Sequence, residues 1–263
     1  MLEKHEIFTS YNLVHIIVIV FTLIVCALVF VFRNKLKIDK FQKILFIVGI
    51  ITEVIKVFSY TIINEDRLGG YLPKTDLPFH LCSIQIILFA ILVFSKNDKI
   101  KRVIYGFMLP TCLIGGFAAI LIPTYSSKTY PLIFIQYFTY HIAIVAFAFN
   151  LLISKEIKFT IKDYFTTLKL LAVVALFALY LNSILYDGTH SVNFMYVIDP
   201  PADNLPILNK DHGWFVYFLS YCAVAIVALT LVYIKPIIDA IISKFKKEEI
   251  EETENNETVW YYK

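Results

Sequence analysis

The chain has 263 residues, of which 59% are apolar and 17% are charged, and its formal net charge is +3. A soluble domain averages roughly 45–50% apolar and 25% charged residues, and a soluble fold of this length could not cover so much apolar surface. The composition argues against a soluble single-core enzyme, a nucleic-acid-binding protein and a disordered protein, and nucleic acid is not an expected partner.

Seven apolar segments are each long enough to cross a bilayer as a helix, because a hydrocarbon core about 30 Å thick requires about 20 helical residues. None alternates with the period of two that a strand would show, and each is apolar around nearly the whole helix. The sequence therefore predicts an all-α integral membrane protein, a bundle of seven transmembrane helices. The predicted helices cover about residues 12–32, 42–63, 77–94, 103–122, 132–153, 168–186 and 214–234.

Lys and Arg residues alternate between the two sides of the predicted bundle. They are frequent in the connections after the first, third and fifth helices and after the last helix, and sparse in the other connections. Cytoplasmic loops hold the excess of Lys and Arg, so we expect the N-terminus outside and the C-terminus in the cytoplasm of a protein of the cell membrane. Residues 1–243 are predicted to form one transmembrane domain, and residues 244–263 a charged, disordered tail.

Two charged residues, Glu53 and Lys56, lie inside the second predicted helix. A charge near the middle of a bilayer is unfavourable by about 2.5–3.5 kcal/mol, so such residues tend to be paired or functional. Because they are three residues apart, both lie on one helix face. The sequence leaves two interpretations: an ion pair that faces the bundle, or the polar lining of a cavity or proton path.

The third predicted helix begins at the outer side, with Asp76 as a candidate N-cap and Pro78 in its first turn. Cys82 follows about one turn inside the outer boundary. Near the positive end of a helix, the pKa of a thiol is lowered and the thiolate becomes a usable nucleophile; a small apolar packing residue is the other interpretation. His80 and Gln85 are candidate substrate-binding residues, although His80 is expected to point away from Cys82 on a helix.

The outer half of the fifth predicted helix is unusually polar. Gln136 and Tyr140 are candidate substrate-binding residues there. His141 lies about 14 Å below the start of the helix, whereas Cys82 lies about 7 Å below the start of its own. His141 is therefore too deep to belong to the aromatic belt of the membrane interface.

The longest outer connection covers residues 187–212 and contains His190 and Asn193. A loop of this length in a compact bundle is usually functional or disordered. We expect it to cap an outward-facing cavity and to contact a lipid headgroup.

No sequence motif predicts a metal or another cofactor. The four cysteines show no CxxC spacing, and no phosphate-binding glycine loop, HExxH or GxSxG motif occurs. The last predicted helix also lacks the lysine to which a retinal would be attached. The expectation is therefore a protein without metal or cofactor.

Three short motifs resemble the YwaF-like family of integral membrane proteins. They are LPFHLC at residues 77–82, NFMY at 193–196 followed by Pro200 and Pro201, and Gly213-Trp214 at the start of the last helix. The resemblance covers about residues 77–234. The family is related to an animal transmembrane acyltransferase that remodels ether phospholipids through a cysteine.

The resemblance implies a fold, a substrate class and two catalytic residues. It assigns Cys82 as the acyl acceptor and His141 as the base, and it makes a membrane lipid the substrate. Many relatives have an acidic residue directly after the cysteine. This chain has Ser83 there, so the resemblance supplies no third, orienting group.

Two hypotheses about function compete. The first is a membrane-embedded acyltransferase that uses Cys82 and His141. The alternative is a non-catalytic transporter or ligand-sensing protein in which Glu53, Lys56, His141 and a kink at Pro110 line a path or cavity. An assembly factor without a small-molecule site is a third option, and the sequence leaves a homo-oligomer open.

Overall fold

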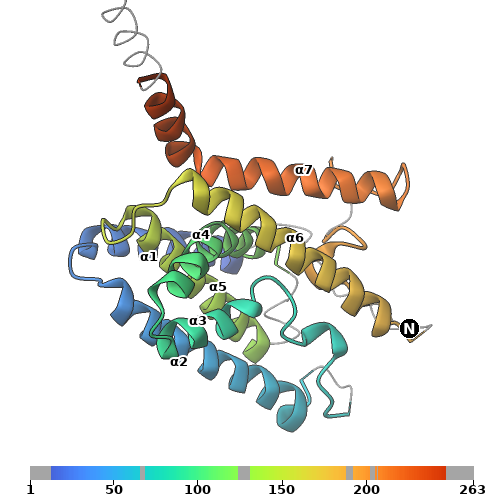
Figure 1. The fold of residues 1–263 in the computed structure, drawn as a ribbon. Coiled ribbons are helices and arrows are strands. Elements are labelled where there is room, and N and C mark those ends of the chain that lie inside the picture. The colour runs from blue at the N-terminus through green and yellow to red at the C-terminus, as the bar shows by residue number, and fades with distance from the viewer. Residues whose placement is uncertain are drawn as a thin grey trace, which may run out of the picture.

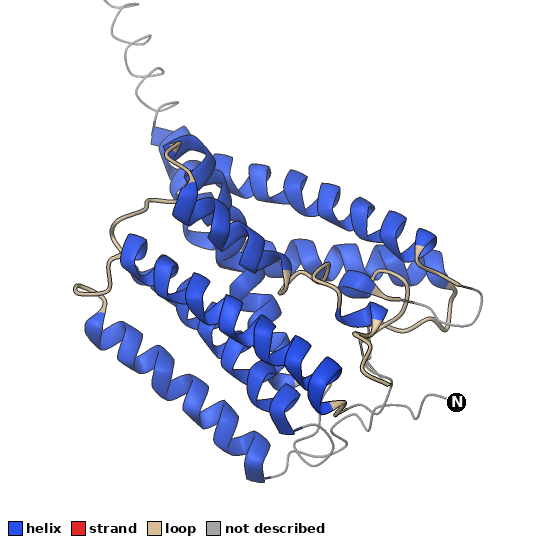
Figure 2. Cartoon of the chain, turned by 90° about the horizontal axis from the view of Figure 1, so that it is seen from below, coloured by secondary structure: helices blue, strands red, loops and turns tan. Residues whose placement is uncertain are grey.

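The computed structural model describes residues 13–65, 69–123, 131–187, 192–201, 205 and 207–246. Every regular element in these residues is a helix, so the predicted all-α class is confirmed (Figures 1 and 2). Residues 234–246 form one more helix after α7. The elements are α1 (Leu13–Phe32), α2 (Ile38–Phe58) with the π-helical turn η1 (Ser59–Ile63), η2 (Lys74–Asp76), α3 (Ile84–Phe94), α4 (Asp98–Leu121), α5 (Pro131–Ile153), α6 (Ile161–Ile184), η3 (Phe194–Tyr196) and α7 (Trp214–Val232).

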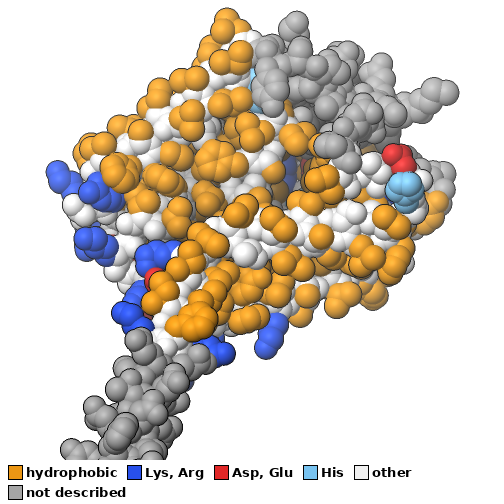
Figure 3. Space-filling model, turned by 90° about the horizontal axis from the view of Figure 1, so that it is seen from above, with side chains coloured by type: hydrophobic (Ala, Val, Ile, Leu, Met, Phe, Trp, Pro, Cys, Tyr) orange, Lys and Arg blue, Asp and Glu red, His pale blue; other side chains and the backbone are white. Residues whose placement is uncertain are grey.

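Six of these helices are long and apolar enough to cross a membrane: α1, α2 with η1, α4, α5, α6 and α7. They run roughly side by side with their connections at the two ends of the bundle (Figure 2). Apolar side chains cover most of the face shown in Figure 3, as expected for a surface in contact with lipid. The protein is therefore a multi-pass helical membrane protein.

The helix predicted over residues 77–94 is wrong in its first seven residues. The helix α3 begins only at Ile84 and has 11 residues, which gives a length of about 16 Å, roughly half of a hydrocarbon core. Pro78 accounts for the first of these residues, because the residue before a proline is disfavoured in helical conformation. Leu77 is accordingly extended, with φ −59° and ψ 149°.

Two other helices begin earlier than predicted because polar caps extend them beyond their apolar spans. At the start of α4, the side chain of Asn97 accepts hydrogen bonds from the N–H groups of Lys99 (3.0 Å) and Ile100 (3.3 Å). At the start of α6, the N–H and hydroxyl groups of Thr160 both donate to Asp163 at 2.7 Å. These caps satisfy backbone N–H groups at the helix starts. The apolar segments from which the helices were predicted do not include these polar first turns.

The centre of the bundle is the pair α4 and α5. Both are more than half buried along their apolar windows, whereas only 11% of the α7 window is buried. The two central helices approach closely at Gly116, where a Cβ atom would lie 2.5 Å from the side chain of Val145. Helix α5 also packs against α1 and α2, and α4 packs against α6.

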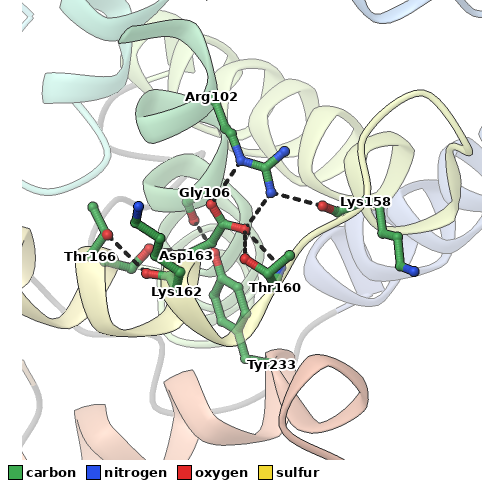
Figure 4. A network of polar contacts seen from close by, with 9 residues as sticks. Arg102, Gly106, Lys158, Thr160, Lys162, Asp163, Thr166 and Tyr233 are labelled. Atoms are coloured by element: carbon green, nitrogen blue, oxygen red, sulfur yellow. Dashed lines mark hydrogen bonds and ion pairs between the residues drawn. The ribbon is translucent and has the colours of Figure 1, made fainter. Parts of the chain in front are cut away.

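The three Lys- and Arg-rich connections meet at one end of the bundle, the basic end. Lys37 pairs with Glu156 at 3.8 Å, and Arg102 donates to the Lys158 carbonyl at 2.9 Å and to Asp163 at 2.7 Å (Figure 4). Figure 3 shows blue Lys and Arg side chains gathered at one end of the molecule. The charge alternation along the sequence thus corresponds to a real polarity of the fold.

The opposite end of the bundle has its own polar contacts. Glu65 accepts hydrogen bonds from the N–H groups of Leu132 (3.0 Å) and Ile133 (3.2 Å), which places a carboxylate at the start of α5. Lys74 pairs with Asp187 at 2.9 Å and connects η2 with the end of α6. The segment that leads from α2 to α3 therefore starts at the end opposite the basic end, whereas α4 begins at the basic end.

Pro110 does not interrupt α4. A proline has no N–H group, so the carbonyl four residues earlier loses its helical partner. That carbonyl belongs to Gly106, and the hydroxyl of Tyr233 donates to it at 2.8 Å (Figure 4). A side chain at the end of α7 thus replaces the hydrogen bond that the proline removes.

This replacement predicts a coupled pair of substitutions. Tyr233→Phe leaves the buried Gly106 carbonyl without a partner and should lower the free energy of unfolding by about 1–3 kcal/mol. Pro110→Ala restores an N–H group and should recover much of that loss in the Tyr233→Phe background. Thermal unfolding of the four proteins in detergent measures the coupling, and an equal effect of Pro110→Ala in both backgrounds would contradict it.

Candidate functional site

The site is built around the non-helical residues 77–83, the broken segment, which precede α3. Backbone carbonyls in irregular chain need donors when no water is available. Two carbonyls of the segment and the one directly before it receive side-chain donors. Gln85 donates to the Leu81 carbonyl at 2.8 Å, Tyr140 donates to the Cys82 carbonyl at 2.8 Å, and Lys56 donates to the carbonyl of Asp76, the last residue of η2, at 2.9 Å. These bonds fasten the broken segment to α2, to α3 and to α5.

The two charges inside α2 form an ion pair. The Lys56 ammonium lies 2.6 Å from a carboxylate oxygen of Glu53, and Lys56 is buried. The same ammonium donates to the Asp76 carbonyl. The ion pair that the sequence left as one of two interpretations is present, and it supports the broken segment.

Cys82 is a half-buried residue directly before Ser83, the N-cap of α3. Its sulfur lies 3.9 Å from the Ser83 hydroxyl. Its carbonyl is held by Tyr140. The thiol therefore lies just before α3, and not about one turn inside the helix as the sequence predicted, because the helix begins later in the chain.

His141 has one engaged and one unengaged ring nitrogen. Nδ1 lies 2.7 Å from the carbonyl of Tyr137. A carbonyl only accepts, so Nδ1 carries the hydrogen and Nε2 of the neutral ring carries the lone pair. Nε2 is buried and has no hydrogen-bond partner among the described residues.

The structure brings the Cys82 and His141 regions to the same level of the bundle. The sequence separated them by about 7 Å in depth, but Tyr140, the neighbour of His141, bonds directly to the Cys82 carbonyl. His141 also lies within electrostatic range of His80. Among the described residues, no hydrogen bond joins the Cys82 sulfur to the His141 ring.

His80 connects the broken segment with the loop between α6 and α7. The Met195 N–H donates to its Nδ1 at 3.4 Å. The ring lies between Phe194 and Tyr196, with centroid distances of 5.2 and 5.5 Å. Because Nδ1 accepts, Nε2 of the neutral His80 ring carries the hydrogen and acts as a donor.

The loop after α6 contains two consecutive residues in left-handed conformation, Met195 (φ 59°) and Tyr196 (φ 56°). A left-handed backbone conformation is strained for residues other than glycine, and it persists only where neighbouring contacts enforce it. The Tyr221 hydroxyl donates to the Met195 carbonyl at 2.6 Å, and the Tyr217 hydroxyl donates to the Tyr196 carbonyl. The Asn182 side chain bonds both to the N–H (2.8 Å) and to the carbonyl (3.2 Å) of Phe194.

The phenol of Tyr196 belongs to the site as well. Burial, with smaller contributions from Cys82 and Asp76, raises the pKa of this phenol to about 12. The group therefore stays protonated at neutral pH and remains a hydrogen-bond donor. Its electrostatic interaction with Cys82 indicates that the strained loop lies near the thiol.

The remaining predicted site residues have different surroundings. Gln85 donates to Thr111 at 3.1 Å, and its Oε1 is buried without a partner among the described residues. Asn193 shapes its own loop by accepting from Ile198 (3.1 Å) and Asp199 (3.3 Å). Gln136 is buried on α5. His190 and the tail residues 247–263 lie outside the described residues.

Sequence reasoning missed the residues that hold the site from the sixth and seventh helices. These are Asn182, Tyr217 and Tyr221. An asparagine inside an apolar helix was one available signal, and two tyrosines four residues apart on one helix face were another.

Two further features of the described residues bear on function. No three His, Cys, Asp or Glu side chains there are grouped as a metal site. A cavity of about 390 Å³ lies at the basic end, away from Cys82, and is lined by residues that include Asp39, Lys101 and Tyr105.

A family model, TMEM164 family, matches residues 7–233 of the chain. No curated protein and no solved structure matches. The match includes the broken segment, His141 and the strained loop.

The bond from Tyr140 to Cys82 predicts a change in thiol accessibility. In a chain whose other three cysteines are replaced by alanine, Tyr140→Phe should raise the rate of Cys82 alkylation by a membrane-permeant maleimide about fivefold, because a bond of about 1 kcal/mol is lost. Tyr137→Phe is the matched control, since its hydroxyl bonds to the Ala119 carbonyl instead. Equal alkylation rates in the two variants would show that Tyr140 does not hold the cysteine.

Proposed function

The chain belongs to the TMEM164 family, and we propose that it is a membrane-embedded lipid acyltransferase with Cys82 as nucleophile and His141 as base. The narrower assignment to YwaF-like proteins is part of this proposal. The observation that carries it is the buried, unpartnered Nε2 of His141, at the level of a half-buried thiol. A general base needs a fixed ring and a free lone pair.

The proposed topology has seven crossings, with the N-terminus outside and the C-terminus in the cytoplasm of the cell membrane. The basic end is assigned to the cytoplasm by its Lys and Arg residues. Since α2 ends at the opposite end and α4 begins at the basic end, residues 64–97 return across the bilayer. The broken segment and α3 together make this crossing, and the polar caps of the broken segment make it possible.

The proposed reaction proceeds in two acyl transfers. His141 takes the proton of the Cys82 thiol, and the sulfur attacks the ester carbonyl of a membrane phospholipid. The ester bond breaks, a thioester forms on Cys82, and His141 returns the proton to the departing lysophospholipid oxygen. A second lipid hydroxyl then attacks the thioester, His141 takes its proton, and that proton goes to the released sulfur.

Neighbouring groups support this chemistry. Burial of a thiol disfavours its thiolate, so a base is required to make the sulfur nucleophilic. The backbone N–H groups of Cys82 and Ser83 flank the thiol in the chain and are assigned as donors to the oxyanion. The protonated phenol of Tyr196 is a further donor for the substrate ester.

The transporter or sensor alternative receives less support. Its proposed polar lining, Glu53 and Lys56, is engaged in an ion pair and in the cap on Asp76. The carbonyl freed by Pro110 is occupied by Tyr233. These groups have structural partners, whereas the Nε2 of His141 has none among the described residues.

The proposal predicts the fate of an isotopically labelled acyl chain in proteoliposomes. Wild-type protein should form a hydroxylamine-sensitive acyl adduct at Cys82 and transfer the label to an added lysophospholipid. Cys82→Ala should abolish both. His141→Asn, whose amide can still donate to the Tyr137 carbonyl, should lower the rate by roughly 10²–10⁴. Lipid mass spectrometry and intact-protein mass spectrometry provide the readouts.

Cys222→Ala is the control, because this thiol lies on α7 outside the site. Transfer that continues in Cys82→Ala would overturn the proposal. Transport or binding that survives Cys82→Ser and is lost in Glu53→Gln would favour the alternative.

A further inference from the structure

An amphipathic helix follows α7. The chain turns at Tyr233, and residues 234–246 are helical again. Five large apolar side chains on this helix are exposed, by 47–65% of their surface. They follow one another at steps of three, four or one residue, which places them on one stripe about 100° wide. They are Ile234, Ile238, Ile241, Ile242 and Phe245.

The rest of this helix includes three lysines. Lys235 and Lys246 lie on one edge of the apolar stripe, and Lys244 lies on the other edge. The single acidic residue in 234–246, Asp239, pairs with Lys235 at 2.6 Å. Lysines on both edges of an apolar stripe are typical of helices that lie in a membrane interface, because their chains can reach up to the headgroups.

The start of the helix is fixed at a definite depth. Tyr233 is completely buried and bonds to the Gly106 carbonyl, and Ile237 packs against the core. Gly106 lies about 12 Å inward from Asp98, where α4 begins at the basic end. Amphipathic interfacial helices lie about 5–10 Å into the boundary between headgroups and acyl chains. The helix of residues 234–246 therefore starts near the depth of the membrane interface.

The direction of the helix agrees with an interfacial position. Figure 1 shows the red helix leaving the bundle at a sharp angle to α7 instead of continuing its line. It starts at the end of the molecule where Lys and Arg side chains gather (Figure 3). A helix that leaves a membrane bundle sideways at this level runs along the leaflet.

We propose that residues 234–246 form an interfacial helix that binds anionic phospholipids of the cytoplasmic leaflet. The apolar stripe lies against the acyl chains, and the lysines on its edges bind the negative headgroups. This charge complementarity favours anionic lipid over a second copy of the chain, whose identical helix would bring the same lysines together. The inference concerns a surface separate from the Cys82 site and does not depend on acyl transfer.

The test uses the full chain in nanodiscs and follows hydrogen–deuterium exchange of the amides in residues 234–246. Replacing part of the phosphatidylcholine with phosphatidylglycerol should slow this exchange at least about tenfold, because each lysine near an anionic surface strengthens association about fivefold. Lys244→Gln/Lys246→Gln should remove most of that difference, since glutamine preserves the helix propensity. Ile241→Gln/Phe245→Gln should speed exchange in both lipids.

The matched control is Lys96→Gln/Lys99→Gln, which removes two exposed positive charges at the start of α4, at the same end of the bundle. This variant should keep the lipid dependence. Exchange that is the same in both lipids and in both lysine variants would overturn the proposal. Protection that follows the number of chains in a nanodisc, and not the lipid charge, would overturn it in favour of a contact between two copies.

Discussion

The rest of this structure depends on the need of irregular backbone for hydrogen-bond donors inside a membrane. A helix satisfies its own carbonyls, whereas the broken segment before α3 does not. Lys56, Gln85 and Tyr140 supply the donors from three different helices. The polar residues in these apolar helices are therefore first of all structural, and they place Cys82 beside α5 as a consequence.

The same constraint explains how α7 is held. Its surface is largely exposed to the surroundings, and apolar contacts between helices give little net attraction in lipid, because lipid tails are equally apolar. Tyrosine hydroxyls fasten it instead, each to a carbonyl without a regular helical partner. Tyr217 and Tyr221 bond to the strained loop, and Tyr233 bonds to Gly106 below Pro110. Tyrosine hydroxyls thus attach α7 to the bundle, whereas close packing at Gly116 attaches α4 to α5.

The sequence predicted what depends on local pattern and failed where distant residues decide. Apolar run lengths located six long helices, and the distribution of Lys and Arg identified the basic end. The helix over 77–94 was extended too far, because Pro78 is compatible both with a first helical turn and with a break. The choice between them depends on Lys56 and Tyr140, and periodicity within the segment contains no information about either. The sequence did not predict the hydrogen-bond partners of the strained loop for the same reason, because they lie on α6 and α7.

Structural and chemical roles of the buried polar side chains differ in two ways: whether a polar atom has a hydrogen-bond partner, and whether it can accept a proton. A histidine with both ring nitrogens bonded would be a satisfied core residue, and Asn182 shows that pattern with both ends of its amide occupied. His141 differs, because its Nδ1 bond fixes the ring and the tautomer while Nε2 has no partner in the described chain. A buried acceptor without a partner is unfavourable by about 1–3 kcal/mol, and Gln85 Oε1 is in the same state. His141 differs from Gln85 because its lone pair is basic and because its neighbour Tyr140 bonds to the Cys82 carbonyl. In the proposed acyl transfer this lone pair accepts the thiol proton, and a base can do so only if no other donor already occupies it.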